Sequence, residues 1–296
     1  MSLCNLCPRK CNIDRASTSG FCGVGSTMQV ARIAPHMFEE PPISYKNGSG
    51  TVFFCGCNLK CVFCQNRDIS RGATLGKEYS KEALIEEILK LQDVGVHNIN
   101  FVTPTHYADK IAEILEDLRA KNLLNIPTVY NSSGYESVET LRRLDGLIDI
   151  YLPDLKYFSR ELSKKYSFAE DYFDVATKAL SEMLRQTGRY EYQKNEPALL
   201  KSGVIIRHLV LPSHRADSIN IFSRLAELID PYDVLVSVMS QYTPDFARDC
   251  EYKNLHRRVT SFEYDSVCEK VLELGFSGFM QSRSSSDKSY TPDFKN

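Results

Sequence analysis

Short apolar runs recur along the chain from residue 50 onward. They lie at residues 51–54, 98–102, 128–130, 148–155, 204–211, 234–239 and 278–280. Runs of this length, rich in β-branched and aromatic residues, predict strands.

The stretches between these runs have the spacing of amphipathic helices. Leu84, Ile88 and Leu91 fall on one helical face, and Gly95 follows as a stop signal. Similar faces occur within residues 111–118, 172–183, 222–229 and 267–274, the last before Gly275. The alternation predicts an α/β protein with a parallel sheet, either doubly wound or rolled into a full or partial barrel.

The pattern divides the chain into three parts. Residues 1–48 are polar, rich in cysteine and unable to form a core alone, so we expect a small metal-binding segment there. Residues 49–281 contain the strand-helix units, and residues 282–296 form a polar tail.

Composition excludes several classes of protein. The 296 residues are 43% hydrophobic with a formal net charge of −2, so the basic excess typical of nucleic-acid binders is missing. No run reaches the roughly 18 apolar residues that span a bilayer, and the first residues do not resemble a signal peptide. We expect a cytoplasmic protein without nucleic-acid or membrane partners, whose ten cysteines are metal ligands or buried thiols.

Three cysteines follow the first predicted strand closely: Cys57, Cys61 and Cys64. Three thiolates bind three irons of a cubane cluster and leave the fourth open, whereas clusters that only carry electrons normally have four cysteine ligands. The alternatives are buried free thiols, or a zinc site that has no nearby histidine to complete it. The loop leaves the C-terminal end of its strand, where parallel sheets carry ligand sites.

A second group of cysteines precedes this loop, namely Cys4, Cys7, Cys11 and Cys22. Four soft ligands in so short a segment fit a structural zinc and a second iron-sulfur cluster equally well. Thiols without metal are the remaining alternative.

Polar residues gather where the other predicted strands end. They are Thr103 and Thr105 after the second strand, Asn131 and Ser133 after the third, Asp154 and Lys156 after the fourth, and Arg207 and His208, with which the fifth is expected to begin. Each alone could be a helix cap or a solvated loop residue. Together they indicate a ligand site facing the cysteine loop.

The cysteine loop, with Phe63 before its last cysteine, resembles the signature loop of the radical S-adenosylmethionine (SAM) superfamily. With the tracts at residues 131–135, 154–156 and 207–212, the chain is similar to activating enzymes of glycyl-radical proteins, in particular pyruvate formate-lyase activating-enzyme-like proteins with an N-terminal cysteine segment. The resemblance implies a partial (β/α)6 TIM-like barrel with SAM and a [4Fe–4S] cluster as cofactors.

The resemblance also implies roles for individual residues. The cluster ligands would be Cys57, Cys61 and Cys64. Cofactor-binding residues would be Phe63 against the adenine, Asn131 at the amino end of SAM, and Ser133 and Lys156 in the same tracts. Thr103 and Thr105 are also expected to bind the cofactor, because their hydroxyls can accept from an ammonium group. Catalytic residues would be Asp154 and Lys156 in the pocket and Arg207 facing the substrate channel. The Gly-Gly-Glu tract of the family is absent, and residues 102–105 read Val-Thr-Pro-Thr instead.

The implied reaction is reductive cleavage of SAM to a 5′-deoxyadenosyl radical, which removes a hydrogen atom from a glycine of a protein substrate. One alternative is a radical SAM enzyme that acts on a small molecule or another protein, and another is a non-catalytic iron-sulfur protein that transfers electrons. A flavodoxin- or ferredoxin-like donor is expected to dock near Lys60, Arg67 and Arg71.

A short motif is repeated near the end of the chain. Residues 242–246 and 290–294 both read Tyr-Thr-Pro-Asp-Phe. Coincidence between two turns is one explanation. The other is a tail that folds over the open side of the barrel and shields the site through Tyr290 and Phe294.

Overall fold

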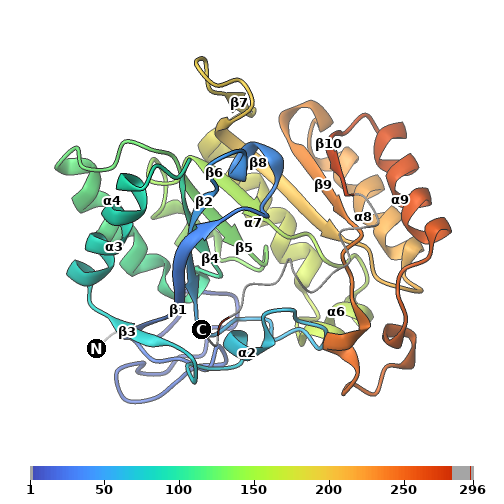
Figure 1. Ribbon diagram of the computed structural model, residues 1–296. Coiled ribbons are helices and arrows are strands. Elements are labelled where there is room, and N and C mark those ends of the chain that lie inside the picture. Colours follow the sequence, from blue (N-terminus) through green and yellow to red (C-terminus); the bar gives the residue numbers. More distant parts are fainter. Residues whose placement is uncertain (1–2, 282–293, 295–296) are drawn as a thin grey trace.

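One open sheet organises the protein. The computed structural model describes residues 3–281 and 294. The strands are β1 (Met28–His36), β2 (Ser49–Phe54), β3 (Lys77–Tyr79), β4 (Ile99–Val102), β5 (Thr128–Ser132), β6 (Ile150–Pro153), β7 (Glu191–Tyr192), β8 (Leu200–Leu209), β9 (Leu235–Met239) and β10 (Ser277–Met280). Their order is β10-β9-β8-β6-β5-β4-β2-β1-β3, with β7 paired to β8 (Figure 1).

The run from β2 to β10 in this order is parallel throughout. All seven strands expected from the apolar runs are present, and the sheet does not close. The expectation of an α/β fold with a partial barrel of parallel strands is therefore confirmed.

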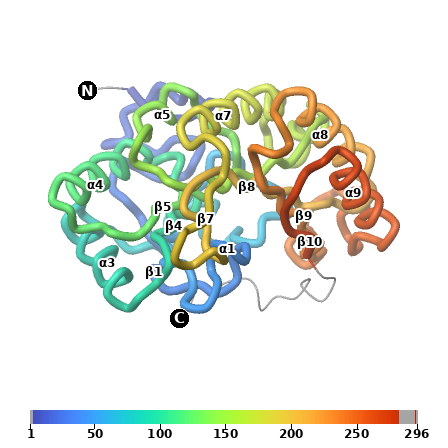
Figure 2. The backbone as a smooth tube through the Cα atoms, turned by 90° about the horizontal axis from the view of Figure 1, so that it is seen from above, coloured from blue at the N-terminus to red at the C-terminus, as the bar shows by residue number. Residues whose placement is uncertain are grey.

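Helices pack around this sheet, as seen along the tube in Figure 2. They are α1 (Pro41–Ser44), α2 (Arg67–Ser70), α3 (Lys81–Asp93), α4 (Ala108–Ala120), α5 (Val138–Arg142), α6 (Arg160–Ser167), α7 (Tyr172–Thr187), α8 (Arg215–Leu228) and α9 (Ser261–Glu273). The five long amphipathic helices predicted from periodicity all form. Thr260 and Glu263 make a capping box that fixes the start of α9.

Two strands at one edge were not expected. β1 runs antiparallel to β2, and β3 runs antiparallel to β1. The alternation of β1 is hard to recognise because the register shifts between Val30 and Arg32, which interrupts the two-residue period. Part of the segment before residue 49 thus belongs to the main sheet.

The fifth predicted strand is also longer than expected. β8 begins at Leu200, so Arg207 lies near its C-terminal end and not at its beginning, as the sequence reading had it. The correction matters because Arg207 then shares the edge of the sheet where β2, β5 and β6 also end. No helix in the described part of the chain is long and apolar enough to cross a membrane.

Arg9 holds the described part of the N-terminal segment, residues 3–25, against the barrel. Arg9 donates to the carbonyls of Asn58 (2.7 Å), Ser167 (3.0 Å) and Phe168. Its guanidinium lies 4.0 Å from the ring centre of Phe21 and 5.2 Å from that of Tyr135. Arg9 therefore joins the N-terminal segment, the cysteine loop and the end of α6.

Candidate functional site

The cysteine loop begins directly after β2 with a tight turn. Gly56 has a φ of +86°, and a Cβ there would lie 2.8 Å from the carbonyl oxygen of Cys22. The next amide, that of Cys57, donates to the same oxygen at 3.2 Å. The N-terminal segment and the cysteine loop thus meet main chain against main chain, where only glycine fits.

Hydrogen-bond donors surround the three thiols of the loop. The Ser167 hydroxyl donates to Cys61 Sγ at 2.9 Å, and the Ser70 hydroxyl donates to Cys64 Sγ at 3.4 Å. The Leu59 amide donates to Cys57 Sγ at 3.3 Å. Donors of this kind stabilise sulfur that carries negative charge, as a metal-bound thiolate does.

Burial makes the thiols of Cys57 and Cys64 poor acids unless a cation binds them. Burial, together with the neighbouring Cys61 and Cys64, raises the pKa of Cys57 to about 12. The pKa of Cys64 is raised for the same reasons. Since the thiolate is the metal ligand, bound iron would supply the charge that the loop itself lacks.

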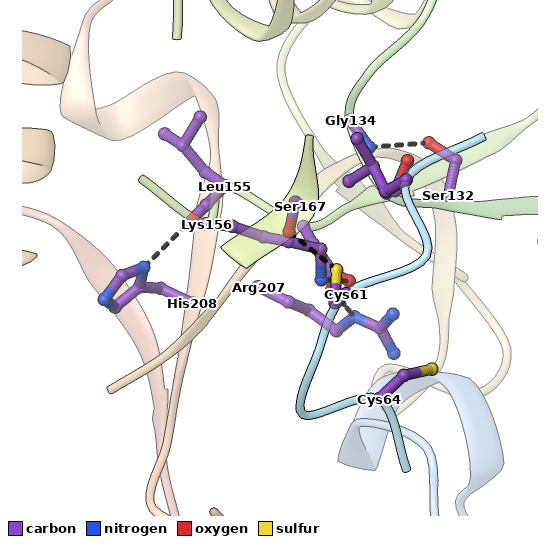
Figure 3. A network of polar contacts seen from close by, with 12 residues as sticks. Cys61, Cys64, Ser132, Gly134, Leu155, Lys156, Ser167, Arg207 and His208 are labelled. Atoms are coloured by element: carbon purple, nitrogen blue, oxygen red, sulfur yellow. Dashed lines mark hydrogen bonds and ion pairs between the residues drawn. The ribbon is translucent and has the colours of Figure 1, made fainter. Parts of the chain in front are cut away.

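A cavity of roughly 200 Å³ lies next to the loop. Cys61, Phe63 and Cys64 line one side, and Asn131, Asp154, Lys156 and Arg207 line the other. Figure 3 shows Lys156 and Arg207 reaching toward the loop that carries Cys61 and Cys64. Seven residues predicted as parts of one site are therefore brought together by four strand ends.

Arg207 is the centre of a buried charge network. It donates to Asp154 (3.0 Å), Asn131 (2.6 Å) and Glu39 (3.3 Å), and Lys156 donates to Asp154 at 2.5 Å. Burial alone would raise the pKa of Asp154, but the charges of Arg207 and Lys156 outweigh it and lower that pKa. Asp154 is thus held as a carboxylate between two cations.

Glu39 is a member of this network that the sequence reading missed. It follows β1, lines the cavity, and accepts from Asn131 at 3.3 Å and from Arg207. Burial raises its pKa, although Arg207 opposes the shift. The only signal in the sequence is the pair Glu39-Glu40 between two otherwise apolar stretches, which names no partner.

Three predicted cofactor-binding side chains lie away from the cavity lining. The Thr105 hydroxyl donates to Glu136 at 2.7 Å, and the Ser133 hydroxyl donates to Asn58 at 3.2 Å. Thr103 adopts a φ of +58°, and its amide donates to the carbonyl of Asn131. Their cofactor-binding role stays a prediction, and their visible contacts support the loops that present Asn131 and the cysteines.

The four N-terminal cysteines lie within electrostatic reach of one another. Burial raises the pKa of Cys7 to about 12, and Cys22 and Cys11 contribute to the shift. Cys22 is influenced in turn by Cys4 and Cys11. Even so, no three Cys, His, Asp or Glu side chains in residues 3–281 are placed so as to hold a single metal ion. A cubane cluster does not require its cysteines to converge on one ion, because each cysteine binds a different iron.

One end of the predicted tail contact lies within the described residues. The ring of Phe294 is 5.4 Å from that of Phe53 in an edge-to-face arrangement, and Phe53 lines the cavity. Tyr290, the other expected anchor, lies outside the described residues. The shielding role of the tail stays a prediction.

Comparison with known proteins identifies the family. Residues 51–192 match the radical SAM superfamily, a range that contains the cysteine loop and the ends of β4, β5 and β6. The uncharacterized protein MJ0674 of Methanocaldococcus jannaschii is 32% identical over 280 residues, which cover 92% of this chain and 73% of that protein. The chain belongs to the radical SAM superfamily.

One solved structure shares the fold of this chain with a TM-score above 0.5. SuiB of Streptococcus suis, in its structure bound to the precursor peptide SuiA, superposes with a TM-score of 0.51 at 15% identity. The match covers 85% of this chain and half of the SuiB chain. A domain of pyruvate-formate lyase-activating enzyme from Bacteroides vulgatus has a TM-score of 0.41 at 11% identity, over 60% of this chain and 92% of that one.

Membership of the radical SAM superfamily implies SAM and a [4Fe–4S] cluster as cofactors. The donor set fits this pair of cofactors. Cys61 and Cys64 are the cysteines among the described lining residues of the cavity, and Cys57, in the same loop, is buried. Three thiolates leave one iron free for a second ligand, and the polar wall opposite has both acceptors and donors for an amino acid group.

The N-terminal quartet is expected to bind its own metal in this radical SAM protein. In one variant Cys57, Cys61 and Cys64 are all replaced by serine. Elemental analysis of this variant should still find about one zinc, or one residual cluster, per chain, because the four thiols of the N-terminal quartet lie outside the cavity. Replacing Cys4 and Cys7 as well should remove that metal. Equal metal content in the two variants, or none in the first, would show that the quartet holds no metal.

Proposed function

We propose that this radical SAM protein is an activating enzyme, which removes a hydrogen atom from a glycine of a protein substrate. The observation that carries the proposal is the single cavity in which Cys61 and Cys64 face Asn131, Asp154, Lys156 and Arg207. The tracts that contain these residues are the ones that resemble glycyl-radical activating enzymes. A protein that only transfers electrons has no need of such a polar wall.

The bound cofactors would supply the radical chemistry, in which reductive cleavage of SAM yields a 5′-deoxyadenosyl radical. The protein's contribution is to bind, orient and exclude water. In this proposal Cys57, Cys61 and Cys64 hold the cluster, and Phe63 packs on the adenine. The ring of Phe63 is itself fixed by edge-to-face contacts with Tyr242 (6.0 Å) and Tyr166 (6.4 Å).

Asn131 and Lys156 are proposed to bind the amino acid end of SAM. Both side chains are positioned before any ligand arrives, because Asn131 is held by Arg207 and Lys156 by Asp154. The pKa of Lys156 is raised, since Asp154 outweighs the effect of burial, so Lys156 presents a positive charge to a carboxylate. Fixed groups of this kind lower the ordering cost of binding.

The proposal is tested with anaerobically reconstituted enzyme and a protein that carries a C-terminal glycyl-radical motif. Reduction with dithionite should release 5′-deoxyadenosine and methionine, and the partner protein should acquire a glycyl EPR doublet. Release of 5′-deoxyadenosine with modification of a small molecule would favour the alternative substrate class. No 5′-deoxyadenosine under any condition would leave an electron-transfer protein.

The same assay examines the proposed flavodoxin- or ferredoxin-like electron donor. Lys60 lies in the cysteine loop, 5.1 Å from the ring centre of Phe21, while Arg67 is paired with Asp249 at 3.3 Å. With flavodoxin in place of dithionite, the rate should fall with added salt and in Lys60→Glu. A rate that responds to neither change would exclude docking at Lys60.

A further inference from the structure

A second cavity of roughly 280 Å³ adjoins the first on the open side of the sheet. It lies between residues 37–41, which follow β1, and the ends of β9 and β10. Figure 2 shows α1, which begins at Pro41, between β1 and β10. Five residues line both cavities, namely Phe38, Glu39, Arg207, Met239 and Gln241. A molecule in the second cavity would therefore be next to the contents of the first.

Every guanidinium nitrogen of Arg207, the one arginine among the described residues of the second cavity, already donates to a protein acceptor. Its Nε is used by Asp154, one terminal nitrogen by Glu39 and the other by Asn131. Three carboxylates already face its charge, namely those of Asp154, Glu40 and Glu39. The cavity is thus unsuited to recognising a carboxylate or phosphate.

Buried hydrogen-bond acceptors without a donor, in contrast, line the second cavity. Glu40 lines the second cavity with only 7% of its surface exposed, and its Oε2 has no hydrogen-bond partner among the described residues. Gln281 lines the same cavity, and its buried Oε1 also has no partner there. Buried acceptors without donors are costly unless a ligand supplies the donors.

We propose that the second cavity binds the ammonium group of an amine-bearing substrate, with Glu40 as its charged partner and Gln281 as a second acceptor. The inference rests on the proposed radical SAM activity and adds the substrate's chemical class to it. If the substrate is a protein, the amine is a lysine side chain near the target carbon.

The charge balance supports this assignment. Burial raises the pKa of Glu40 to about 7, and Glu39 adds to the shift while Arg207 opposes it. A bound cation would restore the ionised form of Glu40. Apolar side chains complete the wall for the stem of an amine, namely Met37, Phe38, Met239, Phe279 and Met280.

The test uses the full chain, anaerobically reconstituted and saturated with SAM, and n-butylammonium as the probe. Calorimetry should detect binding, and Glu40→Gln should weaken it by about tenfold or more, because a charge-assisted hydrogen bond is lost. Gln281→Leu should weaken it by a smaller factor. Butyrate, which has the opposite charge and a similar stem, should not bind.

The control variant is Glu86→Gln, an exposed carboxylate on α3, which should leave binding unchanged. Circular dichroism and iron content verify that each variant is folded and loaded. Equal affinity of wild type and Glu40→Gln, tighter binding of butyrate, or loss of butylammonium binding when SAM is present would each overturn the proposal. These binding measurements need no turnover, so they separate this inference from the proposed activity.

Discussion

Replacement of Cys61 by alanine is expected to abolish SAM cleavage and the absorbance and EPR signal of the main cluster. Cys61 lines the cavity, and its sulfur accepts a hydrogen bond from Ser167 at 2.9 Å. With two cysteines remaining in the loop, a second iron of the cubane would be left without a protein ligand. Release of 5′-deoxyadenosine by the reconstituted variant is the measurement.

Cys55→Ala is the matched control for this prediction. Cys55 is wholly buried, lies two residues before Cys57, and is not among the described residues that line the cavity. Its loss should cost about 1–2 kcal/mol of stability through the space left behind, with the cluster retained. Retained SAM cleavage in Cys61→Ala, or its loss in a folded Cys55→Ala, would contradict the assignment of ligands.

The second large effect is expected from Gly134→Ala. Gly134 has a φ of +76°, and a Cβ there would lie 2.3 Å from the carbonyl oxygen of Asp154. Because the obstacle is backbone, β6 and the Gly134 turn must separate, which we expect to cost about 3 kcal/mol or more. Asp154 would move with its backbone, so SAM cleavage should fall sharply as well.

Gly146→Ala separates the two causes of that effect. Gly146 has nearly the same φ, +75°, but nothing lies within 4 Å of its added Cβ. Only the conformational cost of about 1 kcal/mol should remain, with full activity. Denaturant unfolding of both variants measures the difference, and equal costs would show that β6 does not approach Gly134 as closely as described.

The sequence was informative where the relevant interaction is local or periodic. Cys57, Cys61 and Cys64 lie in one turn, so their spacing alone indicates a cluster loop. Asn131, Asp154 and Lys156 follow apolar runs, and parallel strands bring such ends to one edge of the sheet. These inferences need only the fold class.

The parts that could not be predicted depend on distant pairs. Glu39 and Arg207 are 168 residues apart, and the strand that places Glu39 is disguised by its register shift. Thr105 and Ser133 follow the right strands, but their hydroxyls are used by Glu136 and Asn58. Whether a polar side chain faces the cavity or supports a neighbouring loop is set by packing, which periodicity does not describe.

The contacts of Arg9 constrain the order in which the protein is completed during synthesis. Arg9 leaves the ribosome long before its partners Ser167 and Phe168, which are 158 and 159 residues later in the chain. Arg9 therefore cannot complete its set of contacts until α6 has been made, although its bond to Asn58 needs no later residue. Until then the loop that carries Cys57, Cys61 and Cys64 also lacks the hydroxyl of Ser167 at Cys61, so we expect its thiols to be more accessible to an incoming cluster than they are in the finished protein.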